Sequence, residues 1–154
     1  MLIMIEFMNL SDKIANGSYI PEEYVWECIR MSVYKRIPIL VFVSVPHVNF
    51  INRAMSIITQ ISQEKLRSGN LSAEEWALFD DEMLKVFNAP LYVNDIEVKS
   101  IEDCISSVNS DLIIKEEIKN VFIDSLPETI DKSEIVKWGE NVGFNIYFTK
   151  IAYD

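Results

Sequence analysis

The stretch PILVFVSV, residues 38–45, decides the fold class. It is an almost unbroken apolar run that is rich in β-branched residues. A strand with one face in water alternates apolar and polar residues, whereas a strand covered on both faces does not. The run therefore predicts a strand in the middle of a parallel sheet, with helices above and below it.

Helical patterns flank this strand on both sides. Upstream, Pro21 is followed by Glu22 and Glu23. Proline suits a helix start, and acidic residues suit the positive end of the helix dipole. Apolar residues then recur at four-residue spacing and predict one buried helix face: Val25, Ile29 and Val33. Downstream, residues 50–62 predict a second helix.

The same alternation continues along the rest of the chain. Further strands are predicted at residues 2–7, 90–95, 120–124 and 144–151, and further helices at residues 72–87, 100–110 and 131–143. Ser72 and Glu75 form the S-x-x-E pattern of a capping box. Residues 110–119 fit either a helix end or a charged connection. The pattern predicts one α/β domain over residues 1–154, with a mostly parallel sheet of about five strands.

Composition narrows the classes of partner. The chain has 154 residues, 49% of them apolar, and a formal net charge of −10. Phosphate binding needs a basic surface, so nucleic-acid binding by the chain alone is not expected, and neither is attachment to anionic membranes. No apolar run approaches the ~18 residues of a membrane span, and residues 1–9 lack the features of a signal peptide. We expect a cytoplasmic protein.

Single residues give no strong catalytic signal. Cys28 and Cys104 form no CxxC pair and are expected to be buried thiols. His47 follows a central strand, where α/β sheets place their sites, but no G-x-S-x-G elbow accompanies it. It is expected to be structural or solvent-facing. Adjacent acidic pairs point in different directions on a helix, so they favour solubility over catalysis. The tryptophans Trp26, Trp76 and Trp138 are expected to pack rather than to stack on bases.

A longer stretch carries a family resemblance. It reads ISQEKLRSGNLSAEEWALFDDEMLKVFNAPLYVND, residues 61–95. Its ordered features are Lys65-Leu66-Arg67, Gly69, Leu71, Glu75-Trp76 and the segment APLYVND, residues 89–95. This string closely resembles the motor domain of DnaB-type replicative helicases, between the second and third strands of its RecA-like core. Residues 38–45 look like the family's second strand, residues 120–126 like its Walker B strand, and residues 142–151 like the next strand.

The resemblance implies a three-layer RecA-like α/β core and ATP hydrolysis coupled to movement along single-stranded DNA. The phosphate loop of that chemistry is G-x-x-x-x-G-K-[ST]. None of the four glycines here precedes a lysine. In NGSYIPEEY, residues 16–24, the positions where Gly, Lys and Thr are expected hold Tyr19, Ile20 and Pro21. Proline has no N–H to offer a phosphate, and Glu22 and Glu23 repel one.

The resemblance leaves one other position of interest. The family places a catalytic glutamate after its second strand, but SVPHVNF, residues 44–50, has no carboxylate. Asp124 remains at the end of the Walker B-like strand. It is either a vestigial magnesium position or a structural carboxylate at a strand end. We therefore predict no catalytic, cofactor-binding or metal-binding residue. ATP and Mg²⁺ are implied only if the family activity is retained.

Three hypotheses of function follow. The first is a catalytically inactive DnaB-like domain that acts by protein contact with replicative helicase subunits or with itself. The second is an active helicase ATPase with a non-standard phosphate loop at residues 8–21. The third is a truncated helicase remnant without activity. Residues 144–151 are expected to form an exposed apolar edge strand, which invites pairing with a partner.

Overall fold

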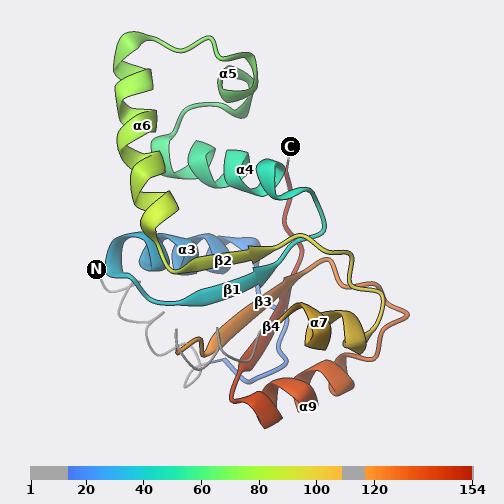
Figure 1. Ribbon diagram of the computed structural model, residues 1–154. Helices are drawn as coiled ribbons and strands as arrows, with labels where there is room; N and C mark the ends of the chain where they lie inside the picture. Colours follow the sequence, from blue (N-terminus) through green and yellow to red (C-terminus); the bar gives the residue numbers. More distant parts are fainter. Residues whose placement is uncertain (1–13, 109–116, 154) are drawn as a thin grey trace.

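A computed structural model describes residues 14–108 and 117–153 (Figure 1). Its four strands form one parallel sheet in the order β2-β1-β3-β4. The strands are β1 (Ile39–Phe42), β2 (Leu91–Asn94), β3 (Asn120–Asp124) and β4 (Asn145–Thr149). The predicted α/β class with a parallel sheet is confirmed, with four strands in place of about five. The strand predicted at residues 2–7 lies outside the described residues.

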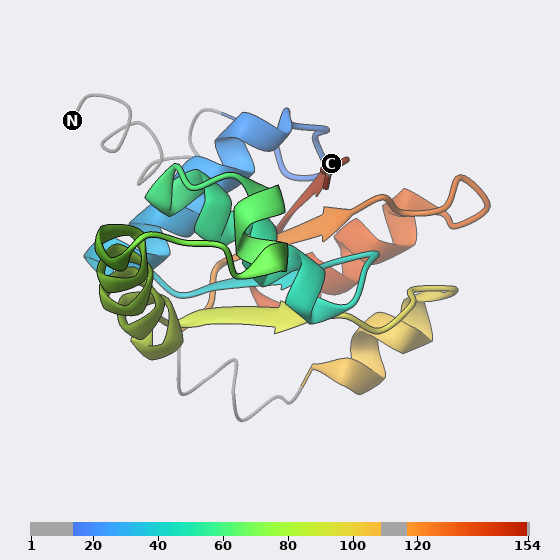
Figure 2. The same ribbon diagram turned by 90° about the horizontal axis from the view of Figure 1, so that it is seen from above.

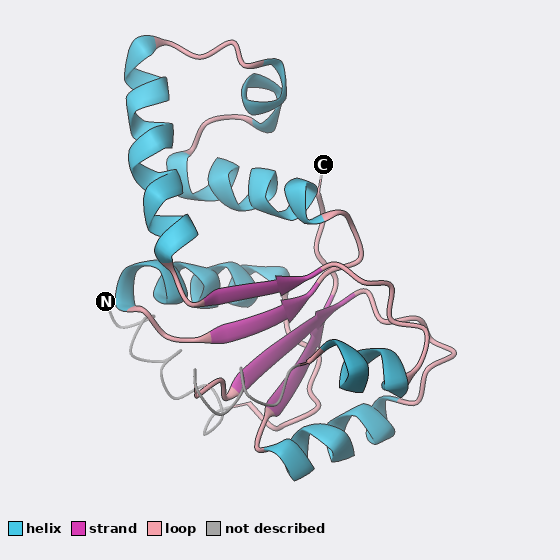
Figure 3. Ribbon diagram, in the orientation of Figure 1, coloured by secondary structure: helices cyan, strands magenta, loops and turns pink. Residues whose placement is uncertain are grey.

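The helices cover both faces of the sheet (Figure 3). They are α3 (Glu22–Lys35), α4 (His47–Thr59), α5 (Gln63–Ser68), α6 (Ala73–Asn88), α7 (Ile101–Ser107) and α9 (Lys132–Val142). One face packs against α3 and α4, and the other against α7 and α9. Within residues 14–108 and 117–153, every helix is too short or too polar to cross a bilayer. Most of the ambiguous segment at residues 110–119 is not described.

The central position of β1 explains its sequence. All four of its residues are buried, and they alternate between two cores. Ile39 and Val41 join the α3 and α4 side, whereas Leu40 and Phe42 join the α7 and α9 side. The prediction of a strand covered on both faces is confirmed.

The predicted apolar face of α3 also packs as expected. Val25, Ile29 and Val33 are buried, at 0%, 1% and 6% exposure. Trp26 lies beside this face and stacks on Phe50 of α4, with the ring centroids 5.4 Å apart. This contact joins the two helices that cover the same side of the sheet.

Helices α5 and α6 form a hairpin that stands away from the sheet (Figure 1). The capping box is confirmed, since the Glu75 N–H donates to Ser72 Oγ and the Ser72 N–H donates to Glu75 Oε1, each at 3.1 Å. Lys65 of α5 also binds Glu75, with Nζ 3.1 Å from Oε2. The short helix α5 was missed by the sequence analysis. Its two cues are Ser62 at its start and Gly69, with φ of 72°, at its end.

The prediction of an exposed edge at residues 144–151 is wrong. The Gly17 N–H donates to the Ile146 carbonyl at 2.7 Å, and the Ile20 N–H donates to the Phe148 carbonyl at 2.8 Å. The Phe148 N–H donates back to the Ser18 carbonyl at 3.0 Å. The outer edge of β4 is therefore covered by a segment far away in the chain. Figure 2 shows β2 at the opposite margin of the sheet.

Candidate functional site

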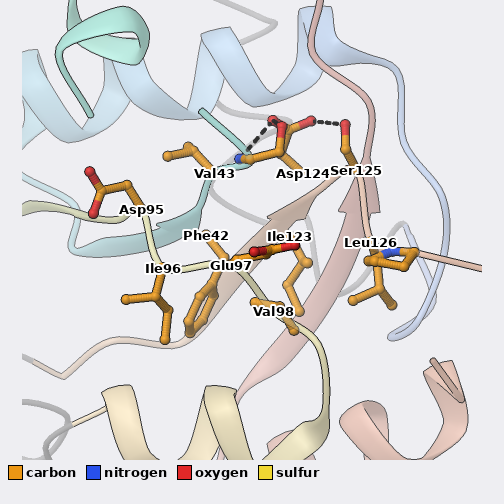
Figure 4. Close-up of a pocket in the computed structure, with 12 residues that line it drawn as sticks. Phe42, Val43, Asp95, Ile96, Glu97, Val98, Ile123, Asp124, Ser125 and Leu126 are labelled. Atoms are coloured by element: carbon orange, nitrogen blue, oxygen red, sulfur yellow. Dashed lines mark hydrogen bonds between the residues drawn. The ribbon is translucent and has the colours of Figure 1, made fainter. Parts of the chain in front are cut away.

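The carboxyl ends of β1 and β3 border a hollow of about 290 Å³ (Figure 4). From β1 the chain continues to β2 on one side of the sheet, and from β3 it continues to β4 on the other side. Such a topological switch point is where open α/β sheets place their ligands. The hollow is lined by Phe42, Val43, Ser44, Asp95, Ile96, Glu97, Val98, Ile123, Asp124, Ser125, Leu126 and Pro127.

The Asp124 carboxylate lies at this point and is 4% exposed. Oδ2 accepts from the Ser44 hydroxyl at 3.0 Å, from the Ser44 N–H at 3.4 Å and from the Tyr153 hydroxyl at 2.7 Å. Oδ1 accepts from the Ser125 hydroxyl at 2.7 Å and from the Ile151 N–H at 2.9 Å. A carboxylate has about four lone-pair sites, so five donors of the same chain occupy its accepting capacity.

These hydrogen bonds join three segments at one carboxylate: the end of β1, the turn after β3 and residues 151–153. Ser125 has a φ of 57°, and its N–H donates to the Thr149 carbonyl at 2.9 Å. The bond from its hydroxyl to Asp124 helps to hold this left-handed turn. Asp124 thus has the structural role that was one of its two predicted interpretations.

Tyr153 is a firm donor in this network. Burial, and next its hydrogen bond to the Asp124 carboxylate, raise the pKa of the Tyr153 phenol far above its usual value. The hydroxyl therefore keeps its proton at neutral pH and continues to donate.

The start of α3 binds the same C-terminal segment. Oε2 of Glu22 accepts from the Ala152 N–H and from the Trp26 Nε1–H, each at 3.2 Å. By the family resemblance, this helix start is where a phosphate loop would end. Here a carboxylate of the chain fills it, and that carboxylate is bound by the chain's own donors.

Backbone amides before α3 are also engaged. The N–H groups of Gly17 and Ile20 donate to β4, and the Ser18 N–H donates to the Ala15 carbonyl at 3.1 Å. Pro21, at the N-cap of α3, has no N–H.

These groups do not fit a magnesium-bound nucleotide. A phosphate-binding loop needs N–H groups that point at the ligand, with positive charge beside them. Among the described residues, no group of three or more His, Cys, Asp or Glu side chains is arranged to hold a metal ion.

The other predicted residues lie elsewhere. His47 is exposed at the first position of α4, as predicted, and its N–H donates to Asp95 Oδ2 at 2.9 Å. Cys28 and Cys104 are buried free thiols, also as predicted. Burial, and next the nearby Asp103 carboxylate, raise the pKa of Cys104 to about 11. Burial raises the pKa of Cys28 even further.

The partners of Asp124 were missed by the sequence analysis. Ser44 lies 80 positions away and Tyr153 lies 29 positions away. No local pattern marks such contacts, because they depend on strand order. Only the location of Ser44 and Asp124 after apolar strands was a usable signal.

Comparison with known proteins gives three results. The family described as DnaB-like helicase C terminal domain matches residues 25–137. A solved ATPase domain superimposes with a TM-score of 0.68 at 13% identity, over 94% of this chain and 61% of that chain. A DnaB-like replicative helicase, solved to examine its interactions with primase, superimposes with a TM-score of 0.63 at 10% identity, over 88% and 39%. A search of the curated proteins finds no match.

The two structures support the fold, and the family match supports the relationship. The chain spans less than two thirds of either solved chain. The RecA-like core expected from the resemblance is confirmed. The family match covers most of the chain and begins just after the loop at residues 16–24. The chain therefore belongs to the DnaB-like helicase C-terminal domain family.

Proposed function

We propose that this protein is a catalytically inactive DnaB-like domain that acts in the cytoplasm by contact with replicative helicase subunits. The observation that carries this proposal is the Asp124 carboxylate, because all five of its recorded donors belong to its own chain. A carboxylate that serves a magnesium ion must keep accepting capacity for the ion or its water.

Electrostatics at the start of α3 support the same proposal. Glu22 and Glu23 place two carboxylates in the first turn of the helix. These charges oppose the polyphosphate of a nucleotide at short range. The loop before the helix offers no lysine in compensation, and its amides at Gly17, Ser18 and Ile20 are already bonded.

Protein contact is the remaining use of the scaffold. The family relationship makes the helicase a natural partner, because a relative can occupy the surfaces that helicase subunits present to each other. One structural relative was solved in work on its interactions with primase, so protein binding is described for that relative. The formal net charge of −10 also favours protein partners over DNA.

Titration calorimetry of the full chain with ATP and Mg²⁺ tests the inactivity. We expect no binding tighter than about millimolar, which corresponds to about −4 kcal/mol. Binding in the micromolar range that Asp124→Asn abolishes would overturn the proposal. Glu97→Gln is the matched control, since Glu97 lines the same hollow and has an exposed side chain.

Size-exclusion chromatography with the replicative helicase of the same cell tests the contact. We expect the chain to elute with the helicase at micromolar concentration, with or without ATP. Separate elution under all these conditions would exclude that helicase as the partner and would favour a remnant without a role.

A second candidate, an ATPase with a non-standard loop, is favoured by the fold shared with an ATPase domain. The buried Thr149 hydroxyl is a further point in its favour, since it lies beside Asp124 in the sheet register and has no hydrogen-bond partner within the described residues. Steady phosphate release from ATP, lost in Asp124→Asn and kept in Glu97→Gln, would select this candidate.

A further inference from the structure

The strand β2 has a free edge among the described residues. It pairs with β1 on one side, and no described strand pairs with it on the other. Its four residues are all partly exposed, whereas those of β1 are all buried. An unpaired edge carries a row of N–H and C=O groups that can bind another strand.

Apolar side chains border this edge. Helix α6 leads directly into β2, and its last turns expose Leu84 and Phe87, at 63% and 80%. Phe87 is the most exposed of the large apolar side chains in the described part of the chain. A hollow of about 310 Å³ lies beside it, lined by His47, Ile51, Met83, Val86, Phe87, Leu91, Val93 and Asp95. Exposed apolar surface next to an open edge is typical of an interaction site.

The two ends of β2 carry opposite charge. Arg36 lies at its start, where Nη1 donates to the Asn88 carbonyl at 2.9 Å. Lys85 is exposed near the same end and lines a further hollow together with Arg36. Asp95 and Glu97 follow the other end of the strand and are exposed. The edge is therefore polar along its length, basic at one end and acidic at the other.

We propose that β2 pairs antiparallel with β2 of a second copy about a two-fold axis, which joins the two sheets into one. Antiparallel pairing places the start of each strand against the end of the other. Arg36 of each copy then faces Glu97 of the other, whereas a parallel arrangement would bring like charges together. A two-fold contact uses the same patch twice, and this patch is self-complementary in charge.

The helices contribute to the same contact. Leu91 and Val93 lie on the face of the sheet that packs against α3 and α4, and α6 packs on that face. An axis perpendicular to the sheet keeps both copies of α6 on one face, so Phe87 of each copy approaches the Val93 end of the other hollow. Four-residue strands bury little area by themselves, so we expect a weak, micromolar dimer that depends on Phe87. This inference goes beyond the proposed function, because self-association needs no helicase.

Light scattering coupled to size exclusion, with the full chain at rising concentration, tests the dimer. We expect the mass to rise from 17.8 kDa to twice that value. A monomer at every concentration up to the high micromolar range overturns the inference.

Phe87→Glu tests the surface. The exposed position tolerates the change without loss of fold, and a charge in the contact should weaken the dimer at least tenfold, about 1.4 kcal/mol. Val142→Glu is the matched control, because Val142 is an exposed apolar residue of α9, which packs on β4 at the other side of the sheet. The control should dimerise as the unchanged protein does. Equal dimerisation of the Phe87 variant overturns the inference.

A charge exchange tests the antiparallel direction. Arg36→Glu and Glu97→Arg should each weaken the dimer, and the double variant should restore it, since each position faces the other across the axis. Lys85→Glu replaces Arg36→Glu if circular dichroism shows that the latter is unfolded. A double variant that remains as weak as the single ones overturns the antiparallel pairing and favours a different protein as the occupant of the edge.

Discussion

At Asp124, hydrogen bonds from the chain offset the cost of burying a charge. A carboxylate without water needs donors, and here the end of β1, the turn after β3 and residues 151–153 supply five. The residue therefore acts as a junction between segments that are distant in sequence. Its loss should be felt as a loss of stability in the whole domain.

We predict that Asp124→Asn lowers the free energy of unfolding by about 2 kcal/mol, because the amide N–H₂ would face donors and leave buried groups unpaired. Urea denaturation followed by circular dichroism measures this. Glu97→Gln, an exposed change in the same hollow, should stay within about 0.5 kcal/mol. A neutral or stabilising Asp124→Asn would instead indicate a carboxylate kept for a metal ion.

At the scale of single elements, Gly139 sets how closely α9 approaches β4. A Cβ at this position would lie 2.6 Å from Cγ1 and 2.8 Å from Cδ1 of Ile146. Ile146 is fully buried in the core between these elements, so it has little room to move. The glycine is therefore required for packing, although it lies inside a helix.

We predict that Gly139→Ala destabilises the protein. Overpacking costs about 1–3 kcal/mol, and the better helix propensity of alanine returns about 1 kcal/mol. A thermal unfolding series gives the net value. Glu140→Ala, an exposed change in the same helix, should have little effect. A stabilised Gly139 variant would show that Ile146 can shift away without cost.

The hairpin of α5 and α6 should be sensitive to acid through Glu75. The Ser72 N–H, and next the Lys65 ammonium, lower the pKa of Glu75 below its usual 4.5. A depressed folded-state pKa contributes stability that is present above the unfolded value and is lost as the pH falls through the folded one.

Glu75→Gln should therefore reduce the dependence of hairpin helicity on pH below pH 4.5, with little change near neutrality. Circular dichroism across this range measures the dependence. Glu74→Gln is the control, since it changes the charge of the same helix turn and leaves the capping box intact. An identical acid profile in both variants would contradict the role of Glu75.

Several elements could be predicted because their signals are local. The bounds of β3, the capping box of α6 and the end of α9 at Gly143 each follow from neighbouring residues. The edge strand was predicted wrongly because the segment that covers β4 lies about as far away as the chain allows. For the same reason, Asp124 could be singled out from the sequence, but its partner Tyr153 could not.

At the scale of the whole molecule, burial is unevenly distributed. Helix α5 has no buried residue, and α6 has only Val86, whereas all of β1 and most of β3 are buried. Local opening is easiest where few apolar contacts are lost. The hairpin therefore should open without unfolding of the sheet.

Hydrogen exchange should show this order. We predict that the amides of residues 63–68 exchange fastest among the helices, and that those of β1 and β3 exchange only on global unfolding. Exchange followed by mass spectrometry resolves the segments. Uniform protection across the hairpin and the sheet would contradict the prediction.

The shared acceptor at Glu22 gives the protein a built-in optical reporter. One carboxylate oxygen binds both the Trp26 indole and the Ala152 amide, so any departure of the last residues changes the polarity around a buried fluorophore. Trp76 is 44% exposed and adds a red-shifted background that can be quenched selectively with iodide. Blue emission that survives the quencher would then follow the release of this segment in real time, without any attached dye.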